Sequence, residues 1–226
     1  MQHLNKNRCS QLHLVFLMAT AILFLGPFYL QGLPMPMAAS RSMGPKRAKP
    51  ITSAAAAESA AEKLRRIRQA SSDGTAPVQE QFSEEEVNSY MEYEMSHRYP
   101  AGVSLIEVRF LPGRISGTSE VDFDELKASG RTPGGMTDAL FWGRHTLDVE
   151  GSFSAIDGVG QFDLESVALD GVTVPQMFVD LLIETFLKPH YPALALDSPF
   201  FLPSSIDRIQ VLRESLLVEI NPTASR

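Results

Sequence analysis

The chain has 226 residues, of which 44% are hydrophobic, so it can build one domain of ordinary size together with a tail. Its formal charge of −7 is divided unevenly, because residues 41–69 carry eight Lys and Arg against two Glu, whereas residues 80–226 carry ten Lys and Arg against twenty-four Asp and Glu. The acidic body argues against nucleic acid as a partner, since affinity for phosphate backbones comes from Lys and Arg, and the lone Cys9 excludes an internal disulfide.

Residues 1–40 have the pattern of an export segment. Lys6 and Arg8 precede an uncharged apolar run at residues 12–30, and small residues that suit a cleavage site follow at 37–40. This pattern predicts a cleaved secretory signal. Because the run is also long enough to span a bilayer, a retained membrane anchor is the alternative. We therefore expect an exported protein, either periplasmic or anchored on the outer side of the cytoplasmic membrane.

Residues 41–81 have the composition of a basic, largely disordered spacer, rich in Ala, Ser, Lys, Arg and Pro. Within it, residues 53–70 contain strong helix formers, but only Leu64 and Ile67 offer an apolar face, so a short and exposed helix is expected. The same stretch holds a cluster of arginines at positions 65, 66 and 68. Such a cluster can contact anionic lipid or a cell-wall polymer, although a solvated charge run is the commoner explanation.

The folded domain is predicted to cover residues 82–220, followed by a polar tail at 221–226. Its first element is a helix, because Ser83 and Glu86 have the spacing of a capping box and three acidic residues lie at the positive end of the helix dipole. This helix should end near His97, where Pro and Gly follow.

Two antiparallel hairpins are predicted next. Residues 103–111 alternate between apolar and polar side chains and return after a Pro-Gly turn, and residues 147–169 form a second hairpin around Asp157-Gly158. A phase slip near Glu165 predicts a bulge, and glycines inside the strands suit a sheet that curls.

Two features between these hairpins have possible chemical roles. Asp122 and Asp124 form a pair of carboxylates, for which an acid/base site and a solvated sheet face are the two interpretations; the second is favoured because no third ligand stands nearby. The Gly-rich segment at 127–143 lacks the spacing of phosphate-binding loops. It is predicted to be an entrance loop whose Phe141 and Trp142 either fold inward or stay exposed at a membrane or a ligand entrance.

The last part of the domain is predicted to contain one helix and two short strands. Residues 175–190 form a helix that is apolar nearly all round its axis, with a polar side chain only at every fourth position. Such a helix must be buried on most sides or lie in the hollow of a curved sheet. The strands at 206–212 and 216–220 complete the domain.

The usual catalytic and metal-binding signatures are missing from the sequence. Its five histidines show no HxxxH or HExxH spacing, and neither CxxC, GxSxG nor a GxGxxG before a helix occurs. We therefore expect no catalytic residues, no metal site, no cofactor and no enzymatic activity.

Three runs of the sequence resemble known proteins: FSEEEVNSYMEYEM, PAGVSLIEVRFLPGRISGTSEVDFDEL and VGQFDLESVALDGVTVPQMFVDLLIE. Their order resembles that of a group of uncharacterised exported bacterial proteins. The layout, a long helix laid in a curled antiparallel sheet, is similar to the tubular lipid-binding (TULIP-like) superfamily and in particular to the mycobacterial phospholipid-binding envelope proteins, over residues 82–220. The resemblance implies an apolar groove for an acyl chain, and no ligand residue of the family carries over to a single position.

The predicted fold is α+β, with a strongly curved antiparallel sheet packed against two helices in a half-barrel or roll. The predicted function is the binding of a lipid or another apolar small molecule between the closing helix and the sheet, by an envelope protein that is also held at the membrane if its N-terminal segment is retained. The same side chains can equally form a filled core. A non-catalytic envelope scaffold that recruits a protein partner through the loop at Trp142 is the alternative function. The residues predicted to line the groove are Phe110, Phe123, Phe153, Phe162, Phe178, Leu182 and Phe186.

Overall fold

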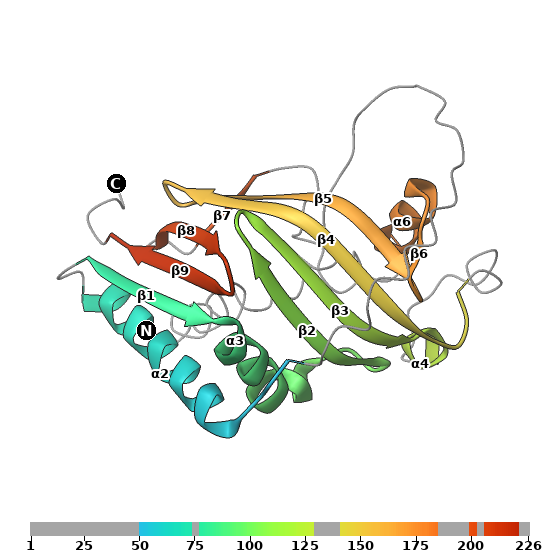
Figure 1. Cartoon of the computed structure of the whole chain (residues 1–226), viewed down its shortest axis with the longest axis horizontal. Helices are drawn as coiled ribbons and strands as arrows, with labels where there is room; N and C mark the ends of the chain where they lie inside the picture. The colour runs from blue at the N-terminus through green and yellow to red at the C-terminus, as the bar shows by residue number, and fades with distance from the viewer. Residues whose placement is uncertain (1–49, 74–76, 129–140, 185–198, 203–205, 222–226) are drawn as a thin grey trace, which may run out of the picture.

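The computed structural model describes residues 50–73, 77–128, 141–184, 199–202 and 206–221 (Figure 1). These residues form an α+β fold on one nine-stranded sheet, which is antiparallel throughout and does not close. The predicted α+β class with a large antiparallel sheet is therefore confirmed. The predicted export segment at residues 1–40 and residues 222–226 of the predicted tail lie outside the described residues.

Nine strands are the commonest elements of the described fold. They are β1 (Val78–Ser83), β2 (Val103–Leu111), β3 (Arg114–Asp122), β4 (Arg144–Ile156), β5 (Val159–Leu169), β6 (Val172–Thr173), β7 (Phe200–Phe201), β8 (Ile206–Leu212) and β9 (Ser215–Ile220). The helices are α2 (Ala54–Asp73), α3 (Glu84–Tyr90), α4 (Phe123–Ala128) and α6 (Gln176–Leu182). Helix α3 continues through a π-helical turn, Met91–Met95, and a 3-10 turn, Ser96–Arg98, so it ends close to the predicted position.

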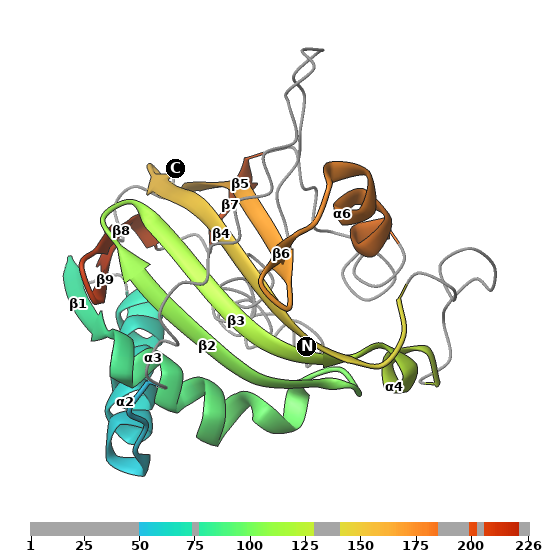
Figure 2. The same ribbon diagram turned by 45° about the vertical axis from the view of Figure 1, so that its right-hand side comes forward.

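The sheet has the strand order β1-β9-β8-β4-β3-β2, and β5 joins it beside β4 and also pairs with β6 and β7. Two strands share one side of β4: β3 pairs with its residues 144–152, and β8 pairs with it further along, at Ala155. Figures 1 and 2 show α2 and α3 near β1, and α6 beside β6 at the opposite end of the sheet. The two helical regions therefore flank opposite ends of the sheet.

Both predicted hairpins are present, as β2–β3 and β4–β5. The predicted bulge is present as well, because Glu150 pairs with Ser166 and Gly151 with Leu164, which leaves Glu165 as an extra residue in β5. The end of the first hairpin differs from the prediction, since β3 stops at Asp122 and α4 follows directly.

Gly151 leaves no room for a side chain where β4 passes this bulge. A methyl group there would stand 2.3 Å from Cζ of the buried Phe162 and 2.6 Å from the carbonyl oxygen of Asp163. Because a paired strand cannot shift without losing hydrogen bonds, Gly151→Ala is expected to lower the free energy of unfolding by about 2 kcal/mol in urea unfolding of the full chain. Ser154→Ala, at an exposed position of the same strand, should change it by less than about 0.5 kcal/mol. Equal effects of the two substitutions would show that the strands can separate here without cost.

Helix α2 differs from the prediction of a short, exposed helix within a disordered spacer. It has 20 residues and buries Ala57, Ala60, Leu64 and Ile67, and it packs against α3, β1 and β9. The prediction of exposure is wrong because it counted only Leu64 and Ile67 as apolar, whereas the two alanines complete a stripe at spacings of three and four residues. Strand β1 pairs with β9 along its whole length. Both elements therefore belong to the same folded unit as residues 82–220.

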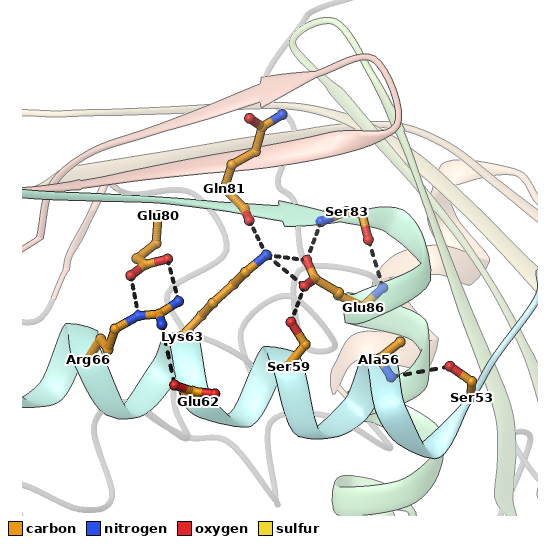
Figure 3. Close-up of polar contacts among 10 residues, drawn as sticks. All are labelled: Ser53, Ala56, Ser59, Glu62, Lys63, Arg66, Glu80, Gln81, Ser83 and Glu86. Carbon is orange, nitrogen blue, oxygen red and sulfur yellow. Dashed lines mark hydrogen bonds and ion pairs between the residues drawn. The ribbon is translucent and has the colours of Figure 1, made fainter.

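Ionic contacts hold α2 against the sheet (Figure 3). The Lys63 ammonium group donates to the Glu86 carboxylate at 2.6 Å and to the backbone carbonyl of Gln81 at 2.6 Å. One turn further on, the Arg66 guanidinium donates to the Glu80 carboxylate at 2.7 Å. Gln81 and Glu80 belong to β1, which is the last strand of the sheet among the described residues. Lys63 and Arg66 therefore cover an edge with which no other described strand pairs.

The predicted capping box at the start of α3 is present, and α2 adds to it. Ser83 Oγ accepts from the backbone N–H of Glu86 at 3.1 Å, and the Glu86 carboxylate accepts from the backbone N–H of Ser83 at 2.8 Å. The same carboxylate accepts from Ser59 Oγ at 2.6 Å and from Lys63. Burial opposes the ionised form, but these hydrogen bonds outweigh it and lower the pKa of Glu86. One carboxylate thus joins α2 to α3.

Candidate functional site

An open groove lies where two strands meet along the same side of β4. The β2–β3 turn reaches this point: the N–H of Gly113 donates to the carbonyl of Val211 at 2.9 Å, and the N–H of Phe153 donates to the carbonyl of Gly113 at 3.0 Å. Beyond the turn, β8 pairs with β4 only through Ala155 and Ile209. β4 and β8 thus share a single residue pair, and both of its residues line the groove.

The groove has a volume of about 430 Å³, which falls in the range of small-molecule sites. Two exposed apolar side chains stand on its rim, Ile156 with 54% and Leu212 with 37% of their surface accessible. Exposed apolar side chains beside a concave surface mark a place where a ligand or a partner can cover apolar surface. The lining also includes four buried apolar residues of the core, which are Phe153, Ala155, Ile209 and Val211. Its polar lining residues are Ser154, Arg208 and Gln210.

Arg208 is the charged residue of this lining. Its Nε lies 3.9 Å from Glu219 Oε2, which is too long for a hydrogen bond. Glu219 belongs to β9 and is turned toward β1, where its Oε1 accepts from Gln79 Nε2 at 3.0 Å. The groove therefore combines a mostly apolar lining with one incompletely paired cation.

A smaller cavity of about 160 Å³ adjoins β2 and the residues that precede α2. Leu105, in its lining, has a φ of 47° at the bulge where the β2–β3 register shifts between Ser104 and Glu107. The hydroxyl of Tyr99, another lining residue, donates to the carbonyl of Met91 at 2.7 Å, and burial raises the pKa of this tyrosine. The hydroxyl is therefore engaged in a structural contact, and the β4–β8 groove is the better candidate for a ligand site.

The residues predicted to line a ligand groove do not lie together: most belong to the core, one of these also lines the β4–β8 groove, and two lie on α6. Phe110, Phe123, Phe153 and Phe162 are all at most 7% exposed and belong to the hydrophobic core. Of these four, Phe153 also lines the β4–β8 groove. Phe178 and Leu182 lie on α6 and are partly buried against the core, while Phe186 lies outside the described residues.

The two aromatic residues predicted for an entrance loop take different positions. Phe141 is buried, with its ring centre 5.4 Å from that of Phe123, whereas Trp142 is 65% exposed. The Trp142 ring stands edge-on to the His145 ring at 6.4 Å. His145 links this segment to the β5–β6 turn, because its Nδ1 lies 2.7 Å from Asp170 Oδ2 and its Nε2 lies 2.7 Å from the carbonyl of Trp142.

Both neighbours of the His145 ring are hydrogen-bond acceptors, so the doubly protonated imidazolium is the form that satisfies them. The hydrogen bond to Asp170 raises the pKa of His145, and the same bond lowers the pKa of Asp170. A raised histidine pKa contributes stability that is fully present below its unfolded value near 6.5 and is lost as the pH rises through the folded value. A lowered aspartate pKa contributes stability above its unfolded value near 3.9, which is lost as the pH falls.

The contribution of this pair to stability is therefore expected to be greatest between about pH 4 and pH 6.5. His145→Asn should lower the free energy of unfolding by about 0.5 kcal/mol at pH 5.5, because exposed ion pairs contribute little. The difference should shrink toward zero above about pH 8, as measured by urea unfolding at both pH values. A loss that is the same at both values would mean that the ring contributes by packing and not by its charge.

The carboxylates of Asp122 and Asp124 are engaged in backbone contacts. Asp122 Oδ1 accepts from the backbone N–H groups of Asp124 and Glu125 at 3.1 Å each, which starts α4. Asp124 Oδ2 accepts from the N–H of Gly143 at 3.0 Å, and Arg144 lies 3.6 Å from Asp122 Oδ2. These contacts favour a structural role for the pair over acid/base chemistry.

Within the described ranges, no group of three or more His, Cys, Asp or Glu side chains is placed to hold a metal ion. None of the helices in the described part of the chain has the length and apolar character that crossing a bilayer requires.

The chain matches no protein-family model, no curated protein and no solved structure. Its function is therefore inferred from the groove and from the sequence.

Sequence reasoning missed most residues of the groove. Arg208 is the one cation of β8, where it stands among the apolar residues Ile206, Ile209 and Val211, and that local pattern was the available signal. The exposed Ile156 directly precedes the Asp157-Gly158 turn, and an apolar residue beside a polar turn was a second signal in the sequence. Neither pattern indicates that β8 comes to lie beside β4, so the groove itself was not predictable.

Proposed function

We propose that this protein binds an apolar ligand, in particular the acyl chain of a lipid, in the groove between β4 and β8. The observation that carries the proposal is a mostly apolar lining in which two side chains, Ile156 and Leu212, are exposed. A ligand that removes apolar surface from water stabilises the complex by about 25 cal/mol for each Å² that it covers.

The cellular setting is also part of the proposal. The protein is exported, acts in the cell envelope and has no enzymatic activity. Export is supported by the basic start and the apolar run of residues 12–30, which have the order of a secretory signal. The proposed site differs in place from the one predicted from the sequence, since it lies between β4 and β8 instead of beside the closing helix, and it shares only Phe153 with the predicted set.

The same proposal includes the finer form of the fold, a strongly curved half-barrel similar to that of the tubular lipid-binding superfamily. The extra residue Glu165 in β5 and the register shift near Leu105 in β2 support it, because bulges bend the strands that contain them. Packing of Val179 from α6 and of the adjoining Ile183 into the common core supports a sheet that turns toward this helix.

Binding of the uncharged fluorescent probe N-phenyl-1-naphthylamine to the purified full chain tests the function. Its fluorescence is expected to rise on binding to the wild-type protein. The double variant Ile156→Asp, Leu212→Asp should bind the probe about tenfold more weakly, since two charges at the rim oppose burial of an apolar molecule. Val172→Asp, at a 70% exposed position of β6, is the matched control and should bind as the wild type does. A wild-type protein that binds no probe, or a rim variant that binds as well as the control, would overturn the proposal.

The alternative function, a non-catalytic scaffold, has one observation in its favour. Trp142 is 65% exposed, and a large aromatic side chain in that state suits the centre of a protein interface. Native mass spectrometry of the protein extracted from its host separates the two functions. A bound lipid supports the groove, whereas a lipid-free complex with another protein that Trp142→Ala abolishes supports the scaffold.

A further inference from the structure

We infer that the ligand of the β4–β8 groove carries a carboxylate group and that Arg208 binds it, so that the protein takes up single-chain fatty acids. The inference rests on the proposed function, because it names the head group of a ligand whose chain occupies the same groove. Arg208 is the one charged side chain among the described residues that line the groove.

The guanidinium of Arg208 is incompletely satisfied within the described part of the protein. Its Nε is buried and has no hydrogen-bond partner there. Its one ion-pair partner among the same residues, Glu219, stays at 3.9 Å because Gln79 holds the other oxygen of that carboxylate at 3.0 Å. Buried donors normally find an acceptor, so an arginine in this state suggests an acceptor that comes from a ligand.

The side chain can also reach a ligand. It is 40% exposed, and since no hydrogen bond holds Nε, the guanidinium can turn toward the groove without breaking one. A carboxylate matches the planar guanidinium with two parallel hydrogen bonds. Leu212, which is exposed and lies on the same face of β8 as Arg208, would contact the first part of the hydrocarbon chain.

The charges around Arg208 favour a singly charged head group, such as a carboxylate, over a phosphate monoester. The adjoining Asp207 and the facing Glu219 are both acidic, so a group with two negative charges would be repelled more strongly than a group with one. The acidic body of the chain acts in the same direction. A single arginine therefore selects a monoanionic head group.

Displacement of N-phenyl-1-naphthylamine by dodecanoate and by 1-dodecanol tests the inference, since the two compounds share a chain and differ in charge. The wild-type full chain should bind dodecanoate about tenfold more tightly than dodecanol. Arg208→Gln should remove this difference by weakening dodecanoate alone. Arg213→Gln, an exposed arginine in the β8–β9 turn, should behave as the wild type does.

A measurement on the wild-type protein gives an independent check if Arg208→Gln does not fold. Raising NaCl from 50 to 500 mM should weaken dodecanoate binding several-fold and leave dodecanol binding unchanged, because salt screens only the charged contact. Equal binding of the two compounds by the wild type, or an equal effect of Arg208→Gln on both, overturns the carboxylate inference and leaves apolar binding intact. No binding of the probe or of either compound overturns the proposed function as well.

Discussion

Ile67→Ala is expected to lower the free energy of unfolding of the full chain by about 3 kcal/mol. The Ile67 side chain is 2% exposed and lies on the face of α2 that packs against the rest of the fold. Removing its outer carbon atoms leaves a cavity that the neighbouring secondary structure cannot collapse to fill. Urea unfolding followed by circular dichroism and by the fluorescence of Trp142, the only tryptophan, measures the loss.

Arg65→Ala is the matched control for this prediction, because Arg65 is exposed on the same helix. It should change stability by less than about 0.5 kcal/mol. If α2 were part of a mobile spacer, both substitutions would have the same small effect. That outcome would remove α2 and its ionic contacts from the folded unit.

Asn88→Ala is expected to lower the free energy of unfolding by about 3 kcal/mol. The Asn88 side chain makes the backbone hydrogen bonds that a neighbouring strand would otherwise make to β2. Its Oδ1 accepts from the N–H of Val108 at 2.7 Å, and its Nδ2 donates to the carbonyl of Val108 at 2.8 Å and to that of Glu84 at 2.8 Å. The side chain is 2% exposed, so water cannot replace these bonds without opening the packing. Alanine leaves both backbone groups of Val108 buried without a partner.

Asn88→Asp distinguishes hydrogen bonding from packing at this position. Aspartate has nearly the same shape as asparagine but places a carboxylate oxygen where Nδ2 donates, so it should destabilise the protein at pH 7 at least as much as alanine does. Gln161→Ala, which removes an exposed amide that donates to Asp163, should change stability by less than about 0.5 kcal/mol. An aspartate variant as stable as the wild type would mean that the amide does not bridge to β2.

Elements that depend on neighbours in the chain were predictable. The capping box of Ser83 and Glu86 and the turn at Asp157-Gly158 each depend on residues a few positions apart, whose side-chain chemistry limits the backbone to few conformations. The extra residue Glu165 was visible as a slip in the alternation of apolar and polar residues.

Elements that depend on contacts across the chain were not predictable to the same degree. Alanine contributes little to an apolar face by itself, so residues 53–70 indicated a solvated helix, although Ala57 and Ala60 are buried once α3 and β9 lie against them. In the same way, a phenylalanine on the inner face of a strand has the same pattern whether it lines a groove or fills a core. Phe110 and Phe162 belong to the core because they pack within the cluster of buried apolar side chains.

The sequence by itself determined that this protein has an α+β fold with two antiparallel hairpins, a capped first helix and an acidic body, because propensity, alternation and charge are properties of short segments. Only the tertiary structure decided that α2 is part of the fold and that Arg208 stands beside an apolar groove. The physical reason is that the groove forms where two segments far apart in the sequence meet, at the pair of Ala155 with Ile209. Pairing between such distant strands depends on the free energy of the whole packed core, which no short segment of the sequence reveals.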